Sequence, residues 1–134
     1  MDSVANLWTA GGVLLGFMVT SFLWRISQEV AVANRNDISW VPPADYVNLA
    51  GMVVVVMGVF LAPLLSIGGG RAPAFALGLG AILFVGHCFA LAGHYELYNN
   101  KSKRTYRYFP FQEKVAIIVV ALAVAGYCGA SLVT

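Results

Sequence analysis

The sequence predicts an all-α integral membrane protein whose four transmembrane helices form an antiparallel up-down bundle. Hydrophobic residues make up 60% of the 134 positions and charged residues only 10%, against roughly 25% charged residues in a soluble domain. Four uncharged intervals, 3–24, 46–70, 72–95 and 115–134, hold 20 to 25 residues each. About 20 apolar residues in an α-helix cross a hydrocarbon core of about 30 Å. We therefore expect spans at 6–26, 46–67, 73–97 and 112–133 within a single domain, residues 1–134.

The first interval predicts a retained span rather than a cleaved signal peptide. No Lys or Arg precedes Leu7, and the apolar run is longer than the 7 to 15 residues of a signal-peptide core. The residues that follow can continue this helix as far as Ala33, where the turn-forming cluster 34–37 begins. Asp45 is placed to cap the start of the second helix, and Pro63 predicts that this helix ends nearby.

The connection between the second and third spans is short and has few charges. Residues 67–73 contain three glycines, which permit positive φ, and end on Pro73, where the next helix can begin. Helices two and three are therefore expected to be antiparallel neighbours.

The distribution of basic residues predicts the orientation. With four spans, seven of the eight Lys and Arg residues fall on the side of the first and third connections, and only Arg71 falls on the other side. Since Lys and Arg accumulate in cytoplasmic loops, we expect both termini on the non-cytoplasmic side. A bacterial inner membrane or an organelle membrane fits this arrangement.

The third connecting segment interleaves basic and aromatic residues. This pattern also occurs in nucleic-acid-binding proteins, but here it is short and lies between two spans. Contact with lipid headgroups, or with a protein partner, is the better interpretation, and no nucleic acid is expected. The residues concerned are Lys101, Lys103, Arg104, Tyr106, Arg107 and Tyr108.

Small residues at four-residue spacing predict helix-packing faces, because they allow backbones to approach closely in lipid. The pattern does not say whether the partner is another helix of this chain or another protein. The second helix is bulky and β-branched around 53–56, so it is expected to offer more of its surface to lipid. The predicted packing residues are Gly12, Gly16, Ala76, Gly80, Gly86, Ala90, Ala121, Ala125 and Gly129.

His87 and His94 are the strongest candidates for chemistry. Seven residues separate them, so they lie about 20° apart around one helix and about 10.5 Å apart along it. His87 is expected near the middle of the membrane, where an ionisable group is costly unless it has a partner. The favoured interpretation is a pair of neutral histidines bonded to backbone or hydroxyl groups between helices. Proton-relay duty, or one axial ligand each to a haem shared with another chain, is the alternative.

Other polar residues predict structural roles. Arg25 and Glu96 are a candidate interhelical ion pair at the membrane surface. Cys88 and Cys128 differ in expected depth by more than a disulfide can bridge, so two free, buried thiols are expected. No metal site is predicted, because His87 and Cys88 point about 100° apart.

These observations favour a structural or accessory subunit of a larger membrane complex. No catalytic motif is present, so an enzyme is not expected. The expected partners are the lipid bilayer and other membrane subunits. The alternatives are a small homo-oligomeric channel or transporter lined by His87, and a subunit that binds haem or a pigment through His87 or His94. No cofactor is predicted under the favoured interpretation.

Overall fold

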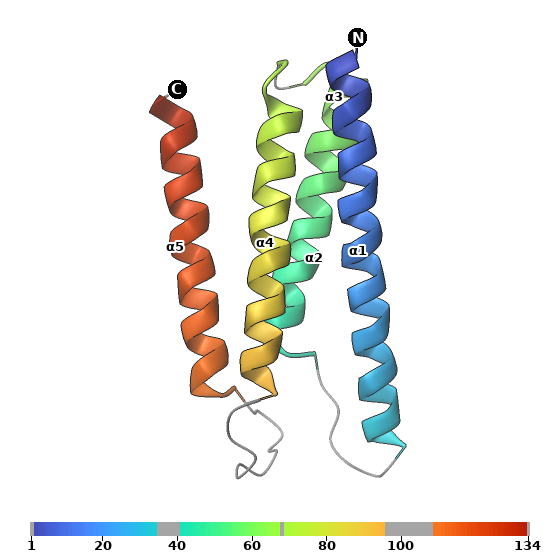
Figure 1. Ribbon diagram of the computed structural model, residues 1–134, viewed down its shortest axis with the longest axis vertical. Coiled ribbons are helices and arrows are strands. Elements are labelled where there is room, and N and C mark those ends of the chain that lie inside the picture. The colour runs from blue at the N-terminus through green and yellow to red at the C-terminus, as the bar shows by residue number, and fades with distance from the viewer. Residues whose placement is uncertain (1, 35–40, 68, 96–108, 134) are drawn as a thin grey trace.

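The computed structural model describes residues 2–34, 41–67, 69–95 and 109–133, and within these ranges it contains helices and short connections but no strand (Figure 1). Four helices are long and apolar enough to cross a membrane: Val4–Ala31, Pro43–Leu64, Ala72–His94 and Phe111–Leu132. The predicted all-α class with four candidate spans is therefore confirmed.

Three of the four helices are continuous, namely α1 (Asp2–Ala33), α4 (Ala72–His94) and α5 (Phe111–Val133). The second span consists of α2 (Pro43–Val55), the π-helix η1 (Val56–Leu61) and the short α3 (Ala62–Leu64). Figure 1 shows α4 between α5 on one side and α1 and α2 on the other, with the start of α1 and the end of α5 at the same end of the molecule.

Pro63 accounts for the interruption of the second span. Proline has no amide hydrogen, and its ring clashes with the carbonyl four residues earlier, which is the carbonyl of Val59. The π-helical turn lies directly before Pro63, and the helix ends at Leu64, so the predicted termination is observed together with a π-helix that was not predicted. The indole of Trp8 donates a hydrogen bond of 3.0 Å to the Val59 carbonyl, which supplies a donor where the proline cannot.

The apolar core lies between α1, the second span and α4. Met18, Val55, Val59 and Ala76 are buried there. The backbones of α2 and α4 approach closely at Gly51 and Gly80, where any Cβ atom would collide with a neighbouring side chain. The second helix was expected to offer more of its surface to lipid. Val53 is exposed, but Val55 is fully buried, and a larger share of the second span than of the first or fourth is buried inside the chain.

The second connection has the features predicted from the sequence, whereas the start of α2 does not. Gly69 has a positive φ of 66° in the second connection, and Pro73 lies in the first turn of α4, both as expected. Asp45, in contrast, is not the N-cap of α2. The N-cap is Pro42, which offers no side-chain hydrogen bond, and Asp45 lies in the first helical turn.

Candidate functional site

Polar side chains from all four long helices meet inside the molecule at one end. This end is formed by the last turns of α1 and α4 and the first turns of α2 and α5 (Figure 1). We refer to the following buried residues as the polar cluster: Arg25, Asp45, Asn48, His87, His94 and Glu113. Buried polar groups are costly unless they are hydrogen-bonded, so the partners of each one decide what the cluster can do.

His87 is completely buried and both of its ring nitrogens have partners. Nδ1 lies 2.8 Å from the carbonyl oxygen of Ala44, and Nε2 lies 3.2 Å from the hydroxyl of Ser21. A carbonyl only accepts, so Nδ1 donates to it, and in the neutral ring Nε2 then accepts from the Ser21 hydroxyl. His87 thus links α4 to α1 and α2 through a hydroxyl and a backbone group.

Glu113 caps the start of α2 from another helix. Its Oε1 accepts a 2.9 Å hydrogen bond from the amide of Ala44, one of the orphan donors at the beginning of α2. Its Oε2 accepts a 2.8 Å bond from Nδ1 of His94. A negative carboxylate is also favoured by the positive end of the α2 dipole. Glu113 therefore does for α2 what we expected of Asp45, and it ties α5 to α2 and α4 at once.

Arg25 is buried and contacts Glu29 on its own helix, Asp45 on α2 and Tyr95 at the end of α4. Its guanidinium donates to the hydroxyl of Tyr95 at 2.7 Å and lies over the ring at 5.4 Å. It forms an ion pair with Glu29 at 2.6 Å, and its Nε is 3.4 Å from Oδ2 of Asp45. The last distance is within ion-pair range, but Nε makes no hydrogen bond. The negative groups around Arg25 offset the cost of burying its charge.

Asn48 completes the cluster on its apolar side. Its side-chain nitrogen donates a 2.9 Å hydrogen bond to the backbone carbonyl of Met18 on α1. Met18 in turn belongs to the apolar core. Asn48 therefore marks the depth at which the polar end of the interior gives way to hydrocarbon side chains.

The predicted pair of histidines is thus brought into one cluster, but with different partners. Ser21, His87 and the Ala44 carbonyl have the order of nucleophile, base and orienting acceptor. Catalysis would also need a donor for an oxyanion, and the side-chain nitrogen of Asn48, the buried amide of the polar cluster, is bonded to the Met18 carbonyl. The arrangement is accounted for as a link between helices.

Several predicted residues lie elsewhere. Glu96, and with it the proposed ion pair with Arg25, lies outside the described residues, as does the basic and aromatic segment Lys101, Lys103, Arg104, Tyr106, Arg107 and Tyr108. Cys88 and Cys128 are free thiols. The expectation that both are buried is wrong, because Cys88 is on the exposed side of α4 and Cys128 is half-buried.

The predicted packing residues fall into two groups. Ala76, Gly80, Gly86 and Ala90 are buried between helices of this chain. Gly12 and Gly16 on α1, and Ala121, Ala125 and Gly129 on α5, are exposed. None of the three exposed glycines has an atom within 4 Å of the position where a Cβ would lie, apart from its own helix and neighbours. On α1 it is Gly11 that packs inward, against Val59.

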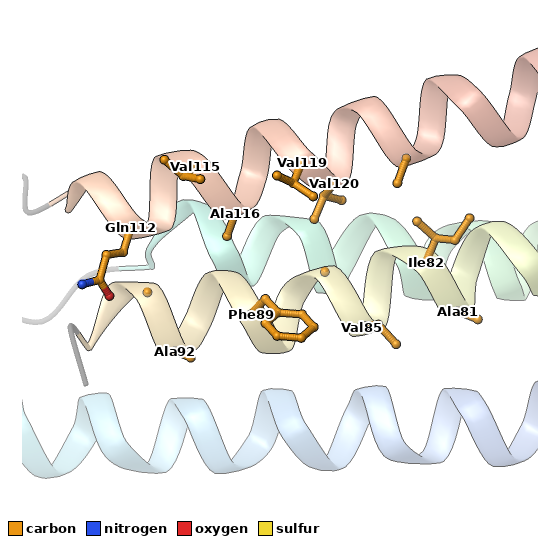
Figure 2. Close-up of a pocket in the computed structure, with 13 residues that line it drawn as sticks. Ala81, Ile82, Val85, Phe89, Ala92, Gln112, Val115, Ala116, Val119 and Val120 are labelled. Atoms are coloured by element: carbon orange, nitrogen blue, oxygen red, sulfur yellow. The ribbon is translucent and has the colours of Figure 1, made fainter. Parts of the chain in front are cut away.

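An apolar groove of about 840 Å³ runs between α4 and α5 (Figure 2). Phe89 from α4 and Val115 and Val119 from α5 line it, and Gln112 is at the end near the polar cluster. In Figure 2, α4 lies between α5, with which it forms the groove, and α1, and none of the residues of the polar cluster lines the groove.

Sequence reasoning missed Glu113, Asn48 and the ion-pair role of Asp45. Glu113 lies just outside the uncharged interval 115–134, so it resembled an ordinary flanking charge. Asn48 did carry a signal, because it is a polar residue inside an otherwise apolar span, three positions after Asp45 and hence on the same helix face.

The described residues contain no group of three or more His, Cys, Asp and Glu side chains that could hold a metal ion. A haem ligand at His87 Nε2 would have to displace the hydroxyl of Ser21, whereas the bond from Nδ1 to the Ala44 carbonyl could remain. Comparisons of the chain with protein-family models, with curated proteins and with solved structures give no match.

Proposed function

We propose that this chain is a structural or accessory subunit of a larger membrane protein complex and that it binds other transmembrane helices through the outward faces of α5 and α1. The observation that supports this is the exposure of the small-residue faces on both helices, Gly12 and Gly16 on one and Ala121, Ala125 and Gly129 on the other. In lipid, such residues favour helix association because they let backbones approach closely.

The position of α5 also supports this proposal. Its principal contact within the chain is α4. Its inner face, which includes Glu113, Val120 and Tyr127, is turned toward α4. The stripe of Ala121, Ala125 and Gly129 lies about 100° or more around the helix from Val120. One side of α5 is therefore available to a neighbouring helix.

The burial of His87 argues against the channel alternative. A pathway lined by His87 between copies of the chain would need its ring at the outer surface, whereas it is completely buried and bonded on both nitrogens. A pathway through a single chain would have to cross the core formed by Met18, Val55, Val59 and Ala76.

We further propose the up-down topology with both termini on the non-cytoplasmic side. The polar cluster would then lie in the cytoplasmic half of the membrane, beside the basic residues of the first and third connections. A bacterial inner membrane or an organelle membrane suits this orientation.

The test is purification of the tagged chain from its native membrane in mild detergent, with mass spectrometry of what accompanies it. The variant Gly129→Leu places a large side chain on the α5 face. The matched control Ala130→Leu adds the same side chain one residue later, about 100° around the helix. Since no atom lies near Gly129 in the chain, the fold should tolerate both, and size-exclusion profiles would verify this.

We expect stoichiometric membrane partners with the natural sequence, at least a fivefold loss with Gly129→Leu, and retention with Ala130→Leu. Purification of the chain alone would refute the proposal. Purification with copies of itself alone would replace it with a homo-oligomer.

A further inference from the structure

Four buried polar atoms in the described part of the chain make no hydrogen bond, and all belong to the interface between α1 and α2. They are Nε and Nη2 of Arg25, Oδ1 of Asp45 and Oδ1 of Asn48. The three residues are at most 3% exposed. An orphaned buried donor or acceptor is costly, and such groups are usually satisfied by protein or by ordered water.

The three side chains face the same interface. Asp45 and Asn48 are three residues apart, so they lie on one face of α2. Asp45 reaches α1 through Arg25, and Asn48 reaches it through the Met18 carbonyl. Two unsatisfied acceptors and an unsatisfied donor group are therefore held between the same two helices.

The chemistry of these atoms selects the occupant. A cation would suit the two oxygens but would be repelled by the guanidinium of Arg25. An anion would suit the guanidinium but would be repelled by Asp45 and Glu29, which pair with it. Water is neutral, donates twice and accepts twice, and internal waters typically make about three hydrogen bonds to otherwise unsatisfied groups.

We propose that the α1–α2 interface contains an internal water-binding site formed by Arg25, Asp45 and Asn48. The water accepts from the guanidinium and donates to the free oxygens of Asp45 and Asn48. The site is independent of the proposed subunit function, because it lies inside one chain.

The direct test is a structure of the full chain in a lipidic mesophase at about 2 Å resolution or better. We expect a density peak within about 3.2 Å of Asn48 Oδ1 and of either Arg25 Nη2 or Asp45 Oδ1. Direct contact of the guanidinium with the Asn48 oxygen, without such a peak, would overturn the proposal. A peak surrounded by five or more oxygens at about 2.3 to 2.6 Å would indicate a cation and would also overturn it.

A solution measurement separates water from a cation without any variant. The thermal midpoint of the purified chain is compared in sodium chloride and in choline chloride at equal ionic strength. Water predicts midpoints that agree within about 1 °C, whereas a bound sodium ion would raise the midpoint in sodium chloride by mass action. A rise of several degrees in sodium would exclude the water site.

The variant Asn48→Leu removes one acceptor and fills its space with hydrocarbon. It should abolish the density peak, and Val53→Leu on the exposed side of α2 should leave it unchanged. If Asn48→Leu does not fold, the density and the salt comparison on the natural sequence still decide the question.

Discussion

Glu113→Ala is the substitution expected to weaken the bundle most selectively, because Glu113 holds two helices through two bonds. The Ala44 amide would lose its cap, which is worth about 1 kcal/mol. His94 would lose a carboxylate partner, worth about 1.5 to 3 kcal/mol for a bond to a charged group. The two losses together predict a decrease of about 3 kcal/mol in the free energy of unfolding, on the order of a hundredfold in the unfolding constant.

Glu113→Gln separates the two contributions. Its amide oxygen can still accept from the Ala44 amide, so the cap is retained. Its NH2 group then faces Nδ1 of His94, so the bond to the carboxylate is replaced by a neutral one in which Nδ1 accepts. We expect a loss of about 1 to 1.5 kcal/mol for this variant. The double-mutant cycle of Glu113→Ala with His94→Ala should give a coupling energy between about 0.6 and 1.7 kcal/mol, the mean and the maximum measured for hydrogen bonds between membrane helices.

The assay is unfolding in mixed micelles with increasing SDS, followed by circular dichroism. Lys114→Ala, at the exposed neighbouring position, should change the stability by no more than about 0.5 kcal/mol. If Glu113→Ala costs less than about 1 kcal/mol, or if the coupling to His94 is zero, the assignment of Glu113 as the tie between helices is wrong.

Three further predictions follow from other contacts. Gly86→Leu would drive its side chain into that of Val120 and should cost about 2 kcal/mol or more in the same titration, whereas Gly126→Leu, which meets no atom within 4 Å, should stay within about 0.5 kcal/mol. Trp8→Phe removes the donor to the Val59 carbonyl within the π-helix and should cost about 1 kcal/mol. An unchanged midpoint would show that this carbonyl is satisfied otherwise. Cys88 is exposed on a predicted span. In intact membranes it should react at least about tenfold faster with an apolar maleimide than with a charged thiosulfonate, because a charged reagent is excluded from hydrocarbon. Equal rates would place this thiol in water.

The helices were predictable because the bilayer allows few solutions. Backbone groups have no water to bond to in hydrocarbon, so an uncharged run of about 20 residues must become a helix. That constraint is local and can be read from composition. The end of α1 at Ala33 could be anticipated for another local reason, because a cluster of turn-forming residues follows it.

The polar cluster was not predictable to the same degree because it depends on which faces meet. His87 and His94 stand out in an apolar run and were found. Glu113 and Asp45 flank their spans, where charges are common and usually face headgroups. Nothing in the local sequence distinguishes a flanking glutamate that reaches water from one that caps a neighbouring helix.

The small-residue patterns likewise did not reveal which helix faces meet. Gly12 and Gly16 have the spacing that Ala76 and Gly80 have, yet the first pair faces outward and the second faces the core. The inward face of α1 is set instead by Gly11, Met18 and Arg25, which recur every seven residues and are all buried. Spacing alone therefore identifies a face suited to packing without identifying its partner.

The way α5 is held gives a physical reason for it to present that face to a partner. Glu113 fixes its first turn to α2 and α4, and 14 residues later Tyr127 stacks on Phe75 at 5.1 Å and donates to the carbonyl of Phe75. At 3.6 residues per turn these two attachment points are about 21 Å apart along the helix and within about 40° of each other around it. The opposite side, with Ala125 and Gly129, is therefore held in a fixed direction before any partner arrives. Ordering a helix on binding lowers affinity, so a helix attached at both ends of one face binds more tightly through the other face than a helix attached at one end. If the proposed partner binds there, releasing the first attachment with Glu113→Ala should weaken that binding as well as stability, although Glu113 itself is completely buried and lies on the other side of α5 from the proposed binding face.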